Sequence, residues 1–221
     1  YLHLSIRRQR QMCIRDRFGT HRVIDSPLAE SGLVGVAIGA ALNEMRPVVE
    51  IQFADFIFPA FNQLVSEAAR MYYRTNGDYP VPLVVRSPYG GGVRGGLYHS
   101  QSVEAFFAHV PGLRVVMPAT VADARDLLIA SVLSPDPVIY IDDRWLYDQE
   151  DELAPIEETD LATQGPQRLR QGTDITIVGS GHATLLALQA ASALCDQGVD
   201  SEVIDLRILN PVSYTHLTLP T

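Results

Sequence analysis

Residues 46–86 read RPVVEIQFADFIFPAFNQLVSEAARMYYRTNGDYPVPLVVR, and this stretch decides the fold class. Residues 46–53 and 81–86 are short apolar runs with several β-branched side chains, which is typical of buried strands. Residues 59–74 between them have the length and composition of a helix. A strand, a helix and a second strand in this order predict a parallel βαβ unit.

The same alternation continues on both sides of this unit. Three more strands and three more helices are expected, the strands at residues 22–25, 113–118 and 137–142 and the helices at 31–45, 101–110 and 121–133. Thr120 opens the last of these helices, and Asp123 stands at capping-box spacing from it. The sequence therefore predicts an α/β fold with a parallel sheet and helices on both faces.

The alternating pattern stops near residue 147. Residues 147–172 are acidic, contain Pro and Gln and lack periodicity, so they are predicted to form an interdomain linker. Residues 173–212 then begin a second strand–helix–strand unit, with its helix at 182–197. One such unit cannot enclose a core of its own, so we expect this second domain to be truncated.

The two ends of the chain differ from its interior. The strings RQRQMCIRDR (8–17) and VSYTHLTLPT (212–221) look like translated sequencing-adapter read-through. We therefore predict that residues 1–17 and 213–221 are not native, although an arginine-rich start is also typical of a mitochondrial transit peptide.

Composition excludes several classes of function. The formal net charge of −9 argues against nucleic acid as a partner. All 17 basic residues are arginine, which excludes a Schiff-base lysine and a Walker-type phosphate lysine within this chain. Cys13 and Cys195 show no metal-ligand spacing, which favours a reducing compartment. No apolar run reaches the ~18 residues of a membrane helix.

Two residues stand where catalytic groups are often found. Glu30 follows a predicted strand and opens an apolar helix, a position that the helix dipole favours for any acid. His99 ends the glycine-rich segment SPYGGGVRGGLYHSQ (87–101), so it is either an acid–base group beside a ligand loop or a capping residue on a surface loop.

Three further motifs have two interpretations each. The segment EIQFADFIFPAF (50–61) is either a buried strand running into a helix or an aromatic shelf for a flat heterocycle. The segment GSGHAT (179–184) is a generic strand-to-helix turn rather than a dinucleotide loop, since Thr184 replaces the third glycine. Gly32, Gly35 and Gly39 indicate close packing of the 31–45 helix, either in the core or against another subunit.

Four strings together resemble the beta subunit of branched-chain 2-oxo acid and pyruvate dehydrogenases, over about residues 20–212. They are RVIDSPLAESGLVGVAIGAAL, EIQFADFIFPAFNQLVSEAARMYYRTNG, VPLVVRSPYGGGVRGGLYHSQSVEAFFAHVPGLRVVMPAT and VIDLRILNP. The resemblance implies that residues 18–146 are a pyrimidine-binding domain lacking its N-terminal part. It also implies that residues 173–212 start a transketolase C-terminal-like domain.

The resemblance further implies thiamin diphosphate bound between this subunit and an alpha subunit that carries the diphosphate and its Mg²⁺. Glu30 would hydrogen-bond the pyrimidine ring nitrogen, Phe56 would stack on the ring and Gln52 would be a neighbouring polar contact. His99 matches the active-site histidine, with a role in reductive acyl transfer to a lipoyl group. Ile57 and Tyr98 would line the same substrate pocket.

A structural K⁺ ion is a further feature that the resemblance suggests. Leu83, Ser131, Val132 and Asp136 are the residues predicted to lie near it. Ser134 and Asp136 replace the acid and Asn that are usual there, which puts the ion in doubt.

The implied function is oxidative decarboxylation of a 2-oxo acid, and EIQFADFIFPAF and LYHSQS favour the branched-chain type over pyruvate. The implied partners are the alpha subunit in an α2β2 heterotetramer and the lipoyl acyltransferase core, in the bacterial cytoplasm or the mitochondrial matrix. The chain alone is expected to be inactive. Alternatives are a transketolase-like or deoxyxylulose-phosphate-type synthase, or a non-catalytic assembly module.

Overall fold

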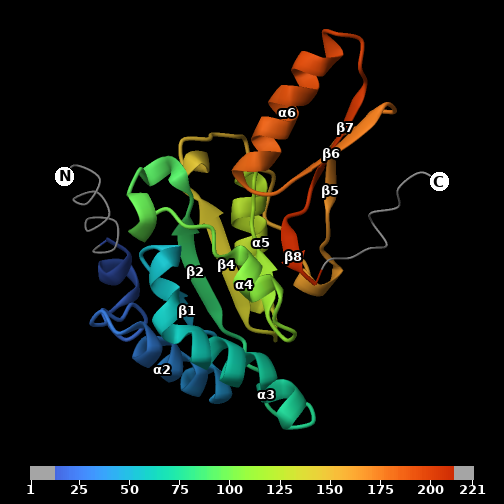
Figure 1. Ribbon diagram of the computed structural model, residues 1–221. Coiled ribbons are helices and arrows are strands. Elements are labelled where there is room, and N and C mark those ends of the chain that lie inside the picture. Colours follow the sequence, from blue (N-terminus) through green and yellow to red (C-terminus); the bar gives the residue numbers. More distant parts are fainter. Residues whose placement is uncertain (1–12, 212–221) are drawn as a thin grey trace.

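The computed structural model describes residues 13–211, and a five-stranded sheet forms its centre (Figure 1). In spatial order its strands are β1 (Val48–Glu50), β2 (Val84–Tyr89), β4 (Val138–Asp143), β3 (Arg114–Val116) and β8 (Ile208–Asn210). The first four are mutually parallel, while β8 pairs antiparallel with β3. The predicted α/β class is confirmed, with one antiparallel strand added at the edge of the sheet.

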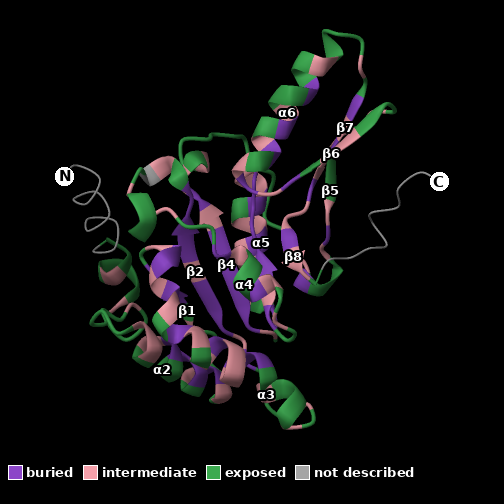
Figure 2. Cartoon of the chain, viewed as in Figure 1, coloured by how far each residue is buried: buried purple, intermediate pink, exposed green. Residues whose placement is uncertain are grey.

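Helices cover the two faces of this sheet unequally. The larger core lies on one face, where Val85 and Ile139 pack with side chains of five helical segments. These segments are α2 (Glu30–Leu42), η1 (Ala54–Ala60), η2 (Gln63–Ala68), α3 (Ala69–Arg74) and α4 (Glu104–Ala108). On the other face, Val84 and Val138 pack against α5 (Val121–Leu133). Figure 2 shows the strands largely buried and the outer sides of the helices exposed.

The helix α5 begins and ends where its sequence predicts. The Oγ1 atom of Thr120 accepts a hydrogen bond of 3.1 Å from the backbone N–H of Asp123. This contact satisfies one of the free N–H groups in the first turn, so the predicted N-cap is confirmed.

Two predictions in the first half of the chain are wrong. Residues 22–25 form no strand, and Ile24 is exposed. The continuous helix predicted at 59–74 is instead the 3₁₀ helix η1, the π-helical η2 and the short α-helix α3. Pro59 lies inside η1, and its missing N–H removes one bond from any α-helical ladder there.

The second unit consists of a three-stranded sheet and one long helix. The helix is α6 (His182–Cys195), and the sheet order is β5 (Gln167–Arg170), β7 (Ser201–Asp205), β6 (Ile175–Gly179). The strand β5 lies within residues 147–172, so the prediction of an interdomain linker there is partly wrong. Three small side chains form its buried core, Ala187, Ala191 and Val203. None of the helices in residues 13–211 is long and apolar enough to span a membrane.

The side chain of Arg207 joins the two units. Its guanidinium donates to the carbonyl oxygen of Gly165 at 2.7 and 2.9 Å and to the carboxylate of Asp123, on α5, at 2.8 Å. Arg207 has a φ of 53°, and β8 follows directly after it. The partly buried Arg207 and a strand shared with the first sheet thus attach the second unit to the first.

Asp205 lies at this junction and is completely buried. Its Oδ1 atom accepts hydrogen bonds from the Thr184 hydroxyl and the Arg207 backbone N–H, while its Oδ2 atom has no partner. Burial raises the pKa of the Asp205 carboxyl to about 6. The folded protein therefore retains a proton that the unfolded chain loses near pH 4.

We predict that the free energy of unfolding falls as the pH rises from about 4 to about 6, because the folded pKa is the higher one. Asp205→Asn, which is neutral at every pH, should remove this slope and stabilise the protein by about 1–2 kcal/mol at pH 7. Urea unfolding between pH 4 and 7 measures both effects. Parallel pH profiles for the variant and the wild type would contradict the prediction.

Candidate functional site

Three aromatic rings meet beyond the carboxyl ends of the parallel strands. His99 packs edge-to-face on Phe53, with 4.7 Å between ring centroids, and on Phe56, with 5.3 Å. Phe53 and Phe56 are themselves 5.5 Å apart in the same arrangement. We call these three residues the aromatic cluster. It brings together two residues predicted from the sequence, Phe56 and His99, although more than forty positions separate them in the chain.

The backbone of the His99 loop is held by Asp55 from the neighbouring segment. Asp55 is buried in η1, and its two carboxylate oxygens accept from the backbone N–H of Gln101 at 3.3 and 3.4 Å. The Gln101 side chain in turn donates to the carbonyl oxygen of Leu97 at 2.8 Å. These bonds connect the loop carrying His99 to the segment carrying Phe53 and Phe56.

Two glycines of this loop are required by close approaches of other atoms. A Cβ atom on Gly95 would lie 2.4 Å from the Cβ of His99. Gly90 has a φ of 94°, and a Cβ there would lie 2.8 Å from an oxygen of the buried Asp143. The short helical turns η3 (Gly91–Val93) and η4 (Gly96–Tyr98) lie between Gly90 and His99. Glycine at these positions therefore serves the packing of the loop.

Arg144 extends over the aromatic cluster from the turn η5 (Arg144–Leu146), which follows β4. Its guanidinium carbon lies 4.5 Å from the centroid of the Phe53 ring, and its Nη2 atom donates to the carbonyl oxygen of Gln52 at 3.2 Å. The sequence interpretation missed both Arg144 and Phe53. The signal in the sequence was their position, since Phe53 is the last residue of one predicted strand and Arg144 lies just beyond another, and parallel sheets place their sites at these strand ends.

The other predicted site residues have different surroundings. Glu30 is the first residue of α2 and is partly buried, and Gln52 is exposed in the turn after β1. Ile57 is completely buried in the main core, so in this structure its side chain packs between elements. Tyr98 is 72% exposed, and its neighbour Leu97 is 78% exposed. The structure therefore does not show Ile57 and Tyr98 lining one common pocket.

Two polar groups of this region have no hydrogen-bond partner. Within residues 13–211, neither the Glu30 carboxylate nor the His99 imidazole forms a hydrogen bond or ion pair. Both residues are partly exposed, so both remain available to a ligand.

The four residues predicted to lie near K⁺ already have hydrogen-bond partners within the protein. The carbonyl oxygens of Leu83 and Ser131 accept from backbone N–H groups at 2.8 and 3.3 Å. The carbonyl oxygen of Val132 accepts from Arg46 at 2.7 Å, and the carboxylate of Asp136 accepts from Arg114 at 2.7 Å. The same Nη1 atom of Arg46 also donates to the carbonyl oxygen of Ser134 at 3.0 Å. A guanidinium thus already binds the end of α5, where cations are favoured.

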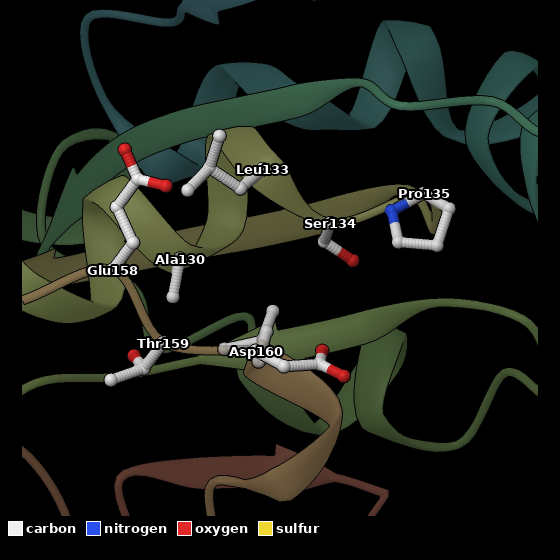
Figure 3. Close-up of a pocket in the computed structure, with 8 residues that line it drawn as sticks. Ala130, Leu133, Ser134, Pro135, Glu158, Thr159 and Asp160 are labelled. Atoms are coloured by element: carbon white, nitrogen blue, oxygen red, sulfur yellow. The ribbon is translucent and has the colours of Figure 1, made fainter.

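A cavity of about 450 Å³ lies between the end of α5 and the segment 158–161 (Figure 3). It is lined by Ala130, Leu133, Ser134, Pro135, Glu158, Thr159, Asp160 and Leu161. None of the residues of the aromatic cluster contributes to it. Beside His99, the side chains of Leu97 and Tyr98 are exposed.

The turn at 179–184 is explained by packing. Gly181 has a φ of 53°, and a Cβ there would lie 2.6 Å from the hydroxyl of Tyr89. A Cβ on Gly179 would meet the backbone of Thr184 at 2.9 Å. The generic-turn interpretation therefore accounts for both glycines without a nucleotide.

Fold and site together define an α/β protein with a cluster of aromatic side chains at the carboxyl edge of a parallel sheet. The chain matches the transketolase pyrimidine-binding domain over residues 7–149 and the transketolase C-terminal domain over residues 166–218. It belongs to the family of proteins built from these two domains. The first match starts before residue 18, the boundary predicted from sequence, and the predictions about residues 1–12 and 212–221 fall outside the described residues.

Several curated relatives are similar over most of this chain. It is 48% identical to the 2-oxoisovalerate dehydrogenase subunit beta of Bacillus subtilis, over 89% of this chain and 60% of the relative. It is 44% identical to the mitochondrial 2-oxoisovalerate dehydrogenase subunit beta of Dictyostelium discoideum, over 90% of this chain and 54% of the relative. It is 39% identical to the pyruvate dehydrogenase E1 component subunit beta of Acholeplasma laidlawii, over 90% of this chain and 61% of the relative. The chain thus spans a little over half the length of these relatives.

Solved structures show the same fold. A split-gene transketolase, described as an inactive beta4 tetramer, superposes with a TM-score of 0.70 at 25% identity, over 86% of this chain and 58% of that one. A transketolase mutant of Pichia stipitis superposes with a TM-score of 0.65 at 20% identity, over 85% of this chain and 27% of the transketolase chain.

The Arg46 contacts lead to a prediction about ions. We expect the same melting temperature in KCl and in choline chloride at equal ionic strength, because the predicted ligand oxygens already accept hydrogen bonds from Arg46, Arg114 and backbone N–H groups. Arg46→Ala should lower the stability by about 1–2 kcal/mol, since it removes a charged donor from two carbonyl groups. Arg70→Ala, on an exposed part of α3, is the matched control. A saturable rise of the melting temperature of the wild type with KCl alone would contradict this.

Proposed function

We propose that this chain is part of the beta subunit of the decarboxylating component of a 2-oxo acid dehydrogenase. The complete enzyme would decarboxylate a 2-oxo acid oxidatively, branched-chain acids being favoured over pyruvate, and would transfer the acyl group to a lipoyl carrier. The aromatic cluster at the carboxyl edge of the sheet carries this proposal. It occurs in a chain 48% identical to a 2-oxoisovalerate dehydrogenase subunit beta.

The proposed cofactor is thiamin diphosphate, and Glu30, Gln52 and Phe56 would hold its aminopyrimidine. The unpartnered Glu30 carboxylate and the partly exposed Phe56 ring fit a flat heterocycle that offers a ring nitrogen and a face for stacking. When bound, this cofactor supplies the carbon nucleophile that attacks a 2-oxo acid and accepts its electrons. The contribution of Glu30 would be to share a proton with the ring nitrogen.

His99 is proposed to act in the second half of the reaction. Its imidazole forms no hydrogen bond with any of residues 13–211, and its ring is fixed by two edge-to-face contacts. It can therefore give or take a proton during reductive acyl transfer while its orientation stays constant. Tyr98, which is exposed beside His99, is proposed only as a neighbour of the substrate.

The proposed partner is an alpha subunit that carries the diphosphate and its Mg²⁺ in an α2β2 heterotetramer. The exposed Leu97 and Tyr98 beside His99 support a site that a second chain would cover. The lipoyl acyltransferase core would be the next partner of the assembled enzyme. Its place would be the bacterial cytoplasm or, in a eukaryote, the mitochondrial matrix. Without the alpha subunit we expect no activity.

A transketolase-like or deoxyxylulose-phosphate-type synthase is the alternative enzyme. It shares the fold, but the transketolase structures are only 20–25% identical to this chain. A neighbouring reading frame for a separate alpha subunit would favour the dehydrogenase. A full-length protein that lacks thiamin-dependent activity with any alpha partner would favour the third alternative, an assembly module.

The proposal predicts a specific effect of Glu30→Gln in the full-length subunit assembled with its alpha partner. Exchange of the proton on the thiazolium C2 atom for deuterium should slow by at least about 100-fold, as expected when a positioned acid–base group is lost. Quenched-flow NMR measures this exchange. Glu44→Gln, an exposed acid beyond the other end of α2, is the control and should exchange like the wild type. Normal exchange in Glu30→Gln would contradict the assignment.

A further inference from the structure

Arg144 contacts the aromatic cluster through the ring of Phe53. The distance of 4.5 Å from its guanidinium carbon to the centroid of the Phe53 ring is that of a cation–π interaction. Its hydrogen bond to the Gln52 carbonyl, of 3.2 Å, holds the residue just before Phe53. Arg144 therefore restrains both the ring of Phe53 and the backbone that carries it.

Phe53 transmits this restraint to His99. The two rings are edge-to-face at 4.7 Å, the shortest centroid distance within the aromatic cluster. Phe56 contacts both rings and completes the set. Since edge-to-face contacts depend on ring orientation, a tilt of Phe53 would move the imidazole of His99.

The turn that carries Arg144 is itself firmly held. The buried Asp143 accepts from the backbone N–H of Trp145 at 2.9 Å, which starts η5. The indole of Trp145 stacks on His182, the first residue of α6, at 5.5 Å with an interplanar angle of 21°. The guanidinium of Arg144 is thus positioned by a turn that contacts the second unit.

We propose that Arg144 is a positioning residue for His99, acting through Phe53 and Gln52. The inference rests on the proposed function, in which His99 serves the acyl-transfer half of the reaction. A catalytic group that is displaced by ~1 Å can lose about 100-fold in rate. A residue such as Arg144, which contacts the neighbour of His99, can therefore have a measurable effect on the rate. Lysine can keep the cation–π contact, but it lacks the planar group that covers a ring and bonds a carbonyl at the same time.

The first experiment measures geometry and needs no activity. Arg144→Met keeps the length of the side chain and removes its charge, and Arg168→Met, at an exposed ion pair with Glu202, is the matched control. The Hε1 resonance of His99, assigned with His99→Gln, reports the ring currents of Phe53 and Phe56. We expect the His99 Hε1 resonance to move toward its random-coil chemical shift in Arg144→Met and to move less in Arg144→Lys. In the control, Arg168→Met, the resonance should keep its wild-type shift.

The second experiment uses the full-length subunit with its alpha partner. Arg144→Met should slow reductive acylation of a free lipoyl domain by about 10–100-fold, with a KM for the 2-oxo acid close to that of the wild type. Decarboxylation measured with an artificial electron acceptor, and exchange at the thiazolium C2 atom, should change less than about threefold. Arg144→Lys should recover part of the acylation rate.

The outcomes separate this inference from the proposed function. An unchanged His99 resonance and an unchanged acylation rate in Arg144→Met would overturn the positioning role, whatever Glu30→Gln shows. An equal loss in both half-reactions would also overturn it, because it would indicate general damage to the site. If the wild-type enzyme decarboxylates no 2-oxo acid, the proposed function fails, while the NMR experiment still tests the geometry. If Arg144→Met does not fold, the His99 chemical shift and the acylation rate of Arg144→Lys decide the question.

Discussion

The structure depends on the parallel pairing of β2 between β1 and β4. Val85 lies opposite Val49 on one side and Ile139 on the other, and all three are buried in one core. Because strands in parallel register point the same way, the segments that leave them all emerge at one edge of the sheet. A slip by one residue would turn every core side chain of β2 to the opposite face and would separate the segments that form the site.

The site is built from the segments that leave the carboxyl ends of these strands. The turn after β1 supplies Phe53 and Phe56, the loop after β2 supplies His99, and the turn after β4 supplies Arg144. Much of this surface is held by backbone bonds and by glycines that let atoms approach closely. The carboxylate of Glu30 and the imidazole of His99 nevertheless remain unpaired within the described residues, and Leu97 and Tyr98 beside His99 are exposed. This is the condition expected of a surface shared with another chain.

The second unit depends physically on the first. Its small core of Ala187, Ala191 and Val203 buries little apolar surface. The attachment comes instead from β8 on the central sheet, from Arg207 on α5 and from the stack of His182 on Trp145. Removal of Arg207 would be costly, because it would leave the buried carboxylate of Asp123 without its ion-pair partner. The same turn, η5, therefore contacts both the second unit and the aromatic cluster.

The sequence by itself determined the α/β class, the parallel order of strands and helices, the Thr120 cap, and Phe56 and His99 as candidate site residues. These features follow from local periodicity, from capping chemistry and from motifs that lie within short stretches of chain. Only the tertiary structure decided that residues 22–25 form no strand, that β5 interrupts the predicted linker and that Ile57 packs in the core. It also decided that Arg46 binds the carbonyl oxygen of Val132, one of the groups assigned to an ion. Several of these depend on a partner far away in the chain, as Arg144 does with Gln52, 92 positions earlier. Pairing and burial between distant segments leave no period in the sequence, and so only the folded molecule reveals them.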